Sequence, residues 1–393
     1  MRKQKKHGHM PRVAIVYTYL PLYHLATMRA MLSSSLIRYE LFSGTNTGSI
    51  KIKVVNSSDE QKKYNIIFKE LKQYWIFRNV LWQRGVISIA CNSHYDAVIF
   101  AGNAYYISTW IAAFIGRIRG QKIFMRTHGV LRQETGLKGL VRKMFYRLAN
   151  GIMLYENRAK DILKSKSFAQ KELFVTYNSL DYNMQKKVRD RLSREDASKL
   201  KASLFSEPDH PLLIFVGRLT PHKRLDLLIK AVGILCKEGY PINAVIIGDG
   251  SERQKLEEEA RLSGMINHVK FVEETFDENI IGPWLHAADV CISPGEVGLT
   301  AIHALAYGTP VITHDDFDYQ MPEVGAIQQN ITGAFFKRGS AEELVIATRN
   351  WLSHVKDRET VRLNCQDIIE RFYNPQMQEQ LTSSAILKIL NNA

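Results

Sequence analysis

The sequence predicts a protein of two α/β domains, each built on a parallel β-sheet with helices on both faces. The chain has 393 residues, about twice the length of a typical domain. Short apolar runs alternate with helical patterns from one end to the other, and the balance of charge changes sign near the middle. With 45% hydrophobic and 23% charged residues, the chain is too apolar to be disordered.

The expected strands are short apolar or β-branched runs bounded by turn residues. Continuous apolar strands that alternate with helices are typical of a parallel sheet buried on both faces. In the first half they are residues 12–17, 97–101, 122–126, 151–155 and 173–176, and in the second half 212–216, 244–247, 269–272, 290–292 and 310–313. After residue 216, an apolar stripe at helical spacing is formed by Leu225, Leu228, Ile229, Val232 and Leu235.

A charged stretch at 186–210 separates the two series of strands and has the composition of a helix-containing linker. The sequence therefore predicts a first domain at 1–190, a linker at 191–205, a second domain at 206–360 and C-terminal helices at 361–393. We expect the C-terminal helices to cross back to the first domain.

The two halves differ in charge. Residues 1–190 carry 32 Lys and Arg against 11 Asp and Glu, whereas residues 191–393 carry 21 against 28. A basic half joined to an acidic one indicates that one domain faces an anionic partner, which is a membrane surface, a lipid-linked substrate or a nucleic acid. Signatures of nucleic-acid-binding modules are absent, so no nucleic-acid partner is expected.

The stretch 97–116 has 20 residues without a charge, the length needed to cross a bilayer. Because it contains Gly102 and Asn103, we interpret it as a buried strand, a turn and an apolar helix that ends near Arg117. The four cysteines form no closely spaced pair, and the basic N-terminus precedes a strand-length run rather than a signal-peptide core. A cytoplasmic protein is expected.

Ligands of open α/β sheets bind beyond the carboxyl ends of the strands, so the loops that follow the apolar runs are the candidate sites. The loop Gly217-Arg-Leu-Thr-Pro-His-Lys-Arg224 places Arg218 and Lys223 between a strand and a helix. Cations at a helix N-terminus suit a diphosphate, and a solvated basic turn is the alternative. A second loop, from Gly295 to Gly298, is a glycine-bearing turn before a helix that begins near Leu299, where backbone amides can cradle an anion.

These loops resemble those of the glycosyltransferases with two Rossmann-like domains facing across a cleft (the GT-B type), specifically the large retaining family GT4. The matching segments are Gly217-Arg-Leu with Lys223, Ile247-Gly-Asp-Gly250, Ala288-Asp-Val-Cys-Ile-Ser-Pro294, the run from Gly298 to Val311, and Thr332-Gly333. The first half matches more loosely, through Arg126-Thr-His-Gly129 and Asn178-Ser-Leu-Asp181. By this resemblance the first domain binds the acceptor and the second binds a nucleotide-sugar donor, a UDP- or GDP-sugar, with no cofactor and no metal.

The resemblance also implies roles for individual residues. Arg218 and Lys223 would hold the donor diphosphate, and His128 would lie near the transferred sugar. The phosphate and sugar would be cradled by Gly295, Glu296, Val297, Gly298, Leu299 and Thr300. The two glutamates of the family pattern fall here on Gly295 and His303, with Glu296 one place late, so we expect His303 to bind a ribose hydroxyl and Glu296 to bind the sugar. The expected catalytic groups are thus His128, Glu296, Arg218 and Lys223, acting electrostatically rather than as nucleophiles.

The second half contains two further acidic features. Asp316-Phe-Asp318 has the form of a metal-binding motif, but its place late in the second domain disfavours a metal. Glu323 resembles a recurrent family position near the donor, with a surface or capping role as the alternative. Gly248-Asp-Gly250 lacks the third glycine of a dinucleotide fingerprint, which argues against a nicotinamide enzyme.

The function expected is that of a retaining glycosyltransferase acting on a glycan or lipid-linked acceptor in cell-surface polysaccharide or lipopolysaccharide synthesis. The alternatives are a catalytically silent nucleotide-sugar-binding protein and an enzyme like the UDP-sugar 2-epimerases. Basic residues interleaved with aromatic ones at 61–84, and basic residues spaced along a helix at 138–147, favour peripheral contact with an anionic membrane, on its inner face. The sequence indicates no oligomeric state.

Overall fold

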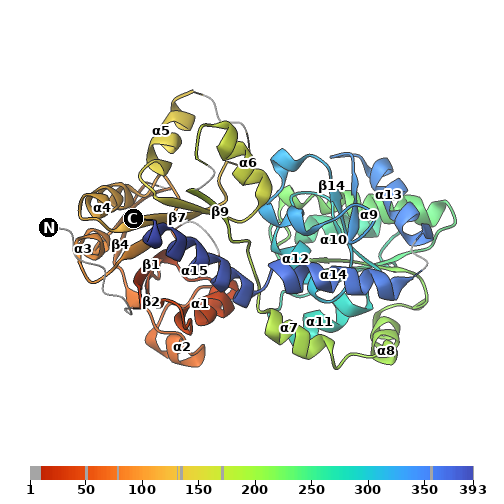
Figure 1. Ribbon diagram of the computed structural model, residues 1–393. Coiled ribbons are helices and arrows are strands. Elements are labelled where there is room, and N and C mark those ends of the chain that lie inside the picture. The colour runs from red at the N-terminus through yellow and green to blue at the C-terminus, as the bar shows by residue number, and fades with distance from the viewer. Residues whose placement is uncertain are drawn as a thin grey trace. The chain divides into compact units, whose positions relative to one another are not determined.

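The computed structural model describes residues 10–48, 52–77, 79–130, 132, 136–169, 172–354 and 357–392. The chain forms two compact units (Figure 1). Unit 1 comprises Met1–Asn178 together with Pro375–Ala393, and unit 2 comprises Ser179–Asn374. The chain therefore passes between the units twice.

Unit 1 is built on a seven-stranded parallel sheet in the order β3-β2-β1-β6-β7-β8-β9. Its strands are β1 (Arg12–Tyr19), β2 (Arg38–Gly44), β3 (Lys69–Glu70), β6 (Ala97–Ala101), β7 (Lys122–Thr127), β8 (Gly151–Leu154) and β9 (Leu173–Val175). A separate antiparallel hairpin pairs β4 (Gln73–Phe77) with β5 (Val80–Gln83). The helices are α1 (Leu25–Leu32), α2 (Ser58–Lys63), α3 (Val86–Cys91), α4 (Ile107–Ile118), α5 (Gly136–Tyr146), α6 (Asn157–Ser165) and α15 (Pro375–Asn391).

Alternate residues of each strand in unit 1 enter two different cores, because successive side chains of a strand point to opposite faces. Ala14 and Val98 pack with residues of α3, α4, α5 and α6 on one face. Val13 and Ile99 pack with α1 and α15 on the other. Both faces of the sheet are thus covered, and the last helix of the chain supplies part of the second cover (Figure 1).

Unit 2 contains a six-stranded parallel sheet in the order β12-β11-β10-β13-β14-β15. The strands are β10 (Leu212–Val216), β11 (Asn243–Ile247), β12 (Val269–Val272), β13 (Val290–Ser293), β14 (Val311–His314) and β15 (Gly333–Phe336). The helices are α7 (Tyr182–Arg189), α8 (Arg194–Leu204), α9 (Leu225–Lys237), α10 (Arg253–Leu262), α11 (Glu278–Ala287), α12 (Leu299–Ala306), α13 (Ala341–His354) and α14 (Arg358–Phe372). The order is that of the Rossmann fold.

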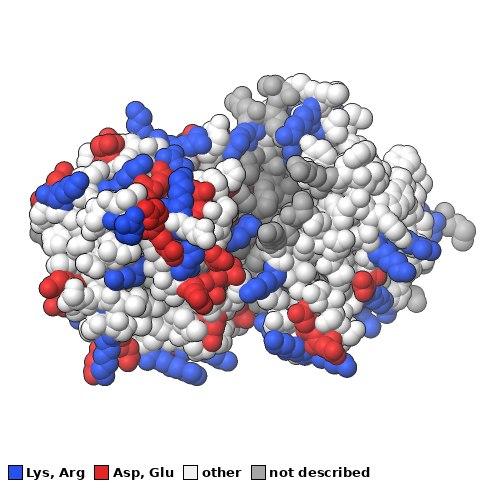
Figure 2. Space-filling model, turned by 180° about the vertical axis from the view of Figure 1, so that it is seen from behind, with Lys and Arg blue, Asp and Glu red and all other residues white. Residues whose placement is uncertain are grey.

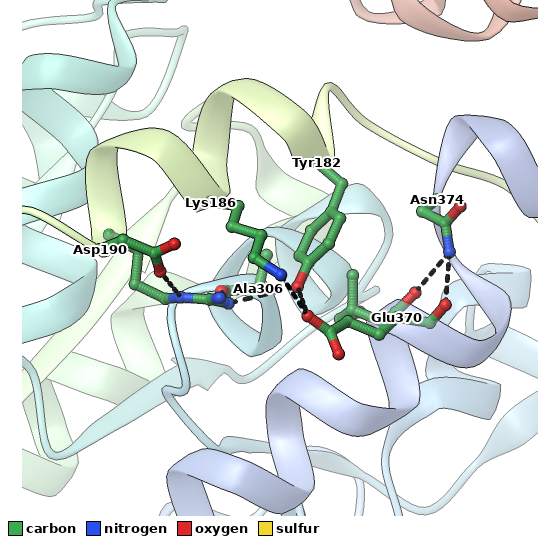
Figure 3. A network of polar contacts seen from close by, with 8 residues as sticks. Tyr182, Lys186, Asp190, Ala306, Glu370 and Asn374 are labelled. Carbon is green, nitrogen blue, oxygen red and sulfur yellow. Dashed lines mark hydrogen bonds and ion pairs between the residues drawn. The ribbon is translucent and has the colours of Figure 1, made fainter.

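The unit boundary falls earlier than the sequence indicates. The sequence places residues up to 190 in the first domain, but α7 belongs to unit 2. Figure 3 shows the reason: Tyr182 and Lys186 of α7 donate hydrogen bonds to the Glu370 carboxylate of α14, at 2.6 and 3.0 Å. Arg189 donates to the carbonyl of Ala306 at the C-terminus of α12, where a cation is favoured.

The C-terminal segment divides between the units. The sequence predicts that residues 361–393 cross back together, but α14 stays in unit 2 and α15 alone joins unit 1. The expected linker at 191–205 is mostly α8, which packs on α11 inside unit 2. Asn374 donates to the backbone carbonyls of Ile369 and Glu370 and ends α14 just before the crossing (Figure 3).

The expected strands all correspond to strands of the two sheets, and the predicted fold class is confirmed. The apolar stretch 97–116 is β6, a turn and the greater part of α4, as interpreted. Among the described residues, no helix combines the length and the apolar character that crossing a bilayer requires. Arg78, in the basic segment 61–84, lies outside the described residues.

The charge difference between the halves is visible on the surface. On the side seen in Figure 2, unit 2 carries Lys and Arg intermixed with Asp and Glu. Unit 1 shows there a broad area without charged side chains, with Lys and Arg along its borders and with Asp and Glu beside them at the lower border.

Candidate nucleotide-sugar site

The topology of unit 2 brings the two expected loops together. Strands β10 and β13 are hydrogen-bonded neighbours, yet their helices leave on opposite sides of the sheet, so the loops that follow them meet at the point where the strand order reverses. Arg218 and Lys223 lie in the first loop, and the turn from Gly295 to Gly298 lies in the second.

Backbone hydrogen bonds join the two loops. The amide of Gly295 donates to the carbonyl of Lys223 at 2.9 Å, and the amide of Glu296 donates to the carbonyl of His222 at 3.1 Å. Lys223 returns a hydrogen bond from Nζ to the carbonyl of Glu296 at 2.6 Å. The lysine is thereby fixed at the start of the glycine turn.

The ammonium group of Lys223 is largely buried, and burial disfavours its charged form. Burial, and next the repulsion from Arg218, lower the pKa of Lys223 below its ordinary value, although Glu296 and Glu323 act in the opposite direction. Arg218 is exposed, and its guanidinium is close enough to influence Lys223. Such a paired positive site is stabilised when an anion enters it.

Gly295 explains the departure from the family pattern. A Cβ atom at this position would lie 2.0 Å from the carbonyl oxygen of His222 and 2.7 Å from the carbonyl carbon of Lys223. Both are backbone atoms and cannot swing aside. A glutamate therefore does not fit at residue 295 while the two loops are hydrogen-bonded as they are here.

The anion cradle is smaller than the sequence suggests. The amides of Gly295 and Glu296 are engaged with the first loop, and the amide of Val297 donates to Gln320 Oε1 at 2.6 Å. Among the described residues, no hydrogen-bond acceptor is recorded for the amides of Gly298, Leu299 and Thr300, which open α12. These three amides are the donors that a phosphate would meet at a helix N-terminus.

Buried side chains support the same turn. Thr300 Oγ1 donates to the carbonyl of Val216 at 2.8 Å and so ties the start of α12 to the end of β10. Gln320, itself buried, donates to the carbonyl of His314 at 3.0 Å while it accepts from Val297. Sequence reasoning missed Gln320, because nothing in the pattern around it marks it as a partner of the turn.

Two carboxylates lie near the cradle. Glu323 is 2% exposed, and its Oε2 is 3.9 Å from the point where a Cβ of Gly298 would stand. Glu296 is half-buried and raises the pKa of Lys223 by its charge. A surface position for Glu323 is wrong, because its side chain is buried, whereas the position near the donor and the capping role both stay predictions.

His303, the position of the second family glutamate, is paired with a carboxylate from another helix. His303 Nε2 lies 3.0 Å from Glu278 Oε2, which also accepts from the hydroxyl of Tyr307 at 2.8 Å. The other Glu278 oxygen accepts from Gln185 Nε2 of α7 at 3.2 Å. Burial would raise the pKa of Glu278, but the charge of His303 and these hydrogen bonds lower it below its ordinary value.

Glu278 was missed by the sequence reasoning although a signal was present. It opens α11, directly after the acid-rich loop that follows β12, and loops after strands are where ligand residues gather. The sequence gives no sign that its partner would be His303, which is 25 residues away.

His128 lies in unit 1, at the end of β7. It is exposed, and its ring packs on Tyr155 with centroids 5.0 Å apart. Beneath it, Arg126 is 6% exposed and bonds to the hydroxyls of Tyr17 and Thr382 at 3.2 and 3.1 Å. Burial, and then Arg126 and His128, lower the pKa of the nearby His24 to about 3.

The Asp-x-Asp motif is partly engaged. Asp316 pairs with Arg338 at 3.0 Å. Within the described ranges, no three His, Cys, Asp or Glu side chains are grouped as a metal ion would need.

Comparison with known proteins agrees with this geometry. The family described as Glycosyl transferases group 1 matches residues 196–366. The chain is 32% identical over 135 residues to D-inositol 3-phosphate glycosyltransferase 2 of Catenulispora acidiphila, an alignment covering 31% of each protein. It is 35% identical over 112 residues to a GDP-mannose-dependent alpha-(1-6)-phosphatidylinositol dimannoside mannosyltransferase of Mycobacterium tuberculosis, covering 28% of each. These alignments span about a third of the relatives' length.

A structural likeness extends over almost the whole chain. The Anabaena protein HepE, solved in complex with UDP, superposes with a TM-score of 0.73 over 95% of this chain and 99% of its own, at 17% identity. At that identity the likeness shows the fold, which is the two-domain GT-B fold expected from the motifs. Residues 196–366 of this chain are thus similar to the family described as Glycosyl transferases group 1.

Proposed function

We propose that this protein is a retaining glycosyltransferase that moves a sugar from a nucleotide-sugar donor to a glycan or lipid-linked acceptor in cell-surface polysaccharide synthesis. The observation that carries the proposal is the joining of the two loops of unit 2, in which Lys223 is held against the glycine turn at the opening of α12. The donor is a UDP- or GDP-sugar, bound without a metal.

The chemistry follows from where the positive charge is placed. A nucleoside diphosphate leaves readily once its developing charge is neutralised, and Arg218, Lys223 and the amides of 298–300 offer that neutralisation. Because Lys223 and the start of α12 are held by hydrogen bonds before the donor arrives, little reorganisation of these groups is needed at the moment of transfer. Glu296 binds sugar hydroxyls, and His128 acts on the transferred sugar from unit 1.

The acceptor side of the proposal rests on unit 1. Its excess of positive charge suits an acceptor presented at an anionic membrane, with the protein bound peripherally on the inner face. One of the relatives is named for a phosphatidylinositol dimannoside, which is a lipid.

Nucleotide binding tests the part of the proposal that concerns the donor. We expect UDP or GDP to raise the melting temperature of the protein in a thermal-shift panel that also contains ADP and the corresponding nucleotide sugars. Arg218→Ala should abolish that shift. Arg261→Ala is the matched control, because Arg261 is an exposed arginine of unit 2 that pairs only locally, with Glu258. An equal loss in both variants would contradict the assignment.

The part of the proposal that concerns sugar transfer is tested by acceptor-dependent release of nucleoside diphosphate, with lipid and glycan extracts as acceptors. Because neither family glutamate position carries a glutamate, a catalytically silent nucleotide-sugar-binding protein is the second candidate. Donor binding without release on any extract would favour the silent protein. Release that needs an acceptor and disappears in Lys223→Ala would support the transferase.

A further inference from the structure

The outer faces of α4 and α5 leave eight apolar side chains exposed to solvent. On α4 the exposed fractions run from 38 to 71%, and the residues are Ile107, Ile111, Phe114 and Ile118. On α5 the exposed fractions run from 38 to 75%, and the residues are Leu137, Leu140, Val141 and Met144. We call these eight residues the α4–α5 face. On each helix they recur at helical spacing and so form one stripe.

The two stripes belong to neighbouring helices of one layer. Ala112 and Ala113 of α4 and Phe145 of α5 pack on the same face of the unit 1 sheet. The rings of Trp110 and Phe145 have centroids 4.9 Å apart, and Arg117 Nη1 donates to the carbonyl of Arg147 at 2.8 Å. Since the buried sides of both helices pack in the core, the exposed α4–α5 face lies on the sides of these helices that the core does not use.

α4 is apolar on its outer side although its other side is already buried. The buried side is formed by small residues, which allow close packing on the sheet: Ser108, Thr109, Ala112, Ala113 and Gly116. Its outer side offers isoleucine and phenylalanine to water, although a helix at the surface of a soluble domain usually carries polar residues there. Exposed apolar stripes of this kind mark a surface that another apolar phase covers.

The charge around the face identifies the partner. Between residues 97 and 155 the sequence contains nine Lys and Arg and a single acid, Glu134. Arg117, Arg119 and Arg147 are exposed at the C-terminal ends of α4 and α5, directly beside the apolar stripes. Apolar side chains bordered by cations match the acyl boundary and the headgroups of an anionic bilayer.

We infer that the α4–α5 face is the surface by which this protein docks on an anionic lipid bilayer, with the eight apolar side chains entering the interface and the arginines contacting lipid phosphates. The inference extends the membrane contact of the proposed function and rests on it for its purpose. It differs from the expectation based on residues 61–84 and 138–147, because α4 lies outside both segments.

The test is cosedimentation of the full chain with vesicles of phosphatidylcholine alone and of phosphatidylcholine mixed with phosphatidylglycerol. We expect binding to the mixed vesicles only, and release by added salt, because the phosphate contacts are screened. Ile118→Asp and Leu140→Asp should each weaken binding about tenfold or more, since an aspartate is repelled by the headgroups and cannot enter the apolar layer.

Leu262→Asp is the matched control. Leu262 and Ile118 are each 71% exposed and each is the last residue of its helix, but Leu262 lies on α10 of unit 2. Its substitution should leave vesicle binding unchanged. Equal loss in both variants, or binding that ignores lipid charge, would overturn the inference. So would a dimer, seen by light scattering, that Ile118→Asp dissociates, because the face would then join two copies of the chain.

The same variants separate this inference from the proposed function. Ile118 and Leu140 belong to unit 1, whereas the loops of the site belong to unit 2, so the thermal shift with UDP or GDP should persist in Ile118→Asp and Leu140→Asp. Retained vesicle binding without any nucleotide response would count against the proposed function alone. A retained nucleotide response without vesicle binding in the unsubstituted protein would count against the docking surface alone.

Discussion

His303 Nε2 of α12 lies 3.0 Å from Glu278 Oε2 of α11, at the position where the family pattern places its second glutamate. A carboxylate is thus present at this point of unit 2, but it is supplied by a different helix.

The pairing predicts that the family residue cannot simply be restored. His303→Glu would place a second carboxylate beside Glu278, and two like charges this close cannot both ionise without cost. We expect a loss of about 1–3 kcal/mol of unfolding free energy at pH 7. The double variant His303→Glu/Glu278→Gln should recover most of that loss, because the amide can donate to the new carboxylate. Purely additive effects in urea unfolding would show that the two residues are not coupled.

Glu278→Gln alone should show a pH-dependent penalty. The pKa of Glu278 is lowered in the folded state, so its contribution to stability is present above the unfolded pKa, near 4.3, and is lost as the pH falls through the folded value. The gap in stability between the unsubstituted protein and Glu278→Gln should therefore be widest at neutral pH and close below about pH 4. Glu257→Gln, an exposed partner of Arg253, should produce a much smaller gap at any pH.

Gly295→Ala tests the joining of the loops. Its Cβ would collide with the backbone of residues 222 and 223, so the loops must move apart and lose their hydrogen bonds. We expect about 1–3 kcal/mol of destabilisation together with loss of the thermal shift given by UDP or GDP. Gly233→Ala is the control, since its Cβ would meet only Met265, at 3.7 Å, and alanine favours the helix. If Gly295→Ala kept a normal thermal shift with UDP or GDP, nucleotide binding would not depend on the hydrogen bonds between the two loops.

Because of Lys223, the affinity for nucleotide should fall as the pH becomes alkaline. Burial and Arg218 lower its pKa, so in the free protein it loses its proton at a lower pH than an ordinary lysine. The Kd for UDP or GDP, measured by calorimetry, should rise as the pH is increased from 7 towards 10. Lys223→Arg should flatten this dependence, because arginine stays charged. Lys223→Ala should weaken binding about 10–100-fold at pH 7, the worth of a charged hydrogen bond.

Ile386→Ala tests the assignment of α15 to unit 1. Ile386 is fully buried in the core that α1 and α15 share with the sheet, so the cavity should cost about 2–5 kcal/mol. Hydrogen exchange followed by peptide should show the loss of protection in unit 1 and not in unit 2. Leu363→Ala on α14, which removes a largely exposed side chain, should change neither unit. Lost protection confined to unit 2 would contradict the division of the chain.

The sequence predicts the strands of both sheets well where they are continuous apolar runs, as in β10, whose bounds at 212–216 were predicted without error. It misses β2, where Arg38 and Glu40 interrupt the apolar run, and β15, where Gly333 opens a strand of four residues. Such strands are specified by their neighbours in the sheet more than by their own composition.

The loops of the site could be predicted because their residue types carry chemistry at a fixed place in the fold. Arg218, Lys223 and the glycine turn were found in this way. The contacts between these segments could not be predicted. Gln320 contacts Val297 and Glu278 contacts His303, and each pair joins segments more than 20 residues apart. The direction of these side chains is set only by the folded backbone. The placement of α7 with unit 2 depends equally on tertiary contacts, made by Tyr182 and Lys186 to Glu370.

The return of α15 to unit 1 has a consequence for how the protein is made. Unit 2 is continuous in sequence, so all of its residues are synthesised before α15. Unit 1 has to wait for that helix, and until then the apolar side chains of α1 and β1 that it covers stay exposed. The unit whose synthesis begins first is thus completed after unit 2, and the nascent chain depends on α15 to close its first core.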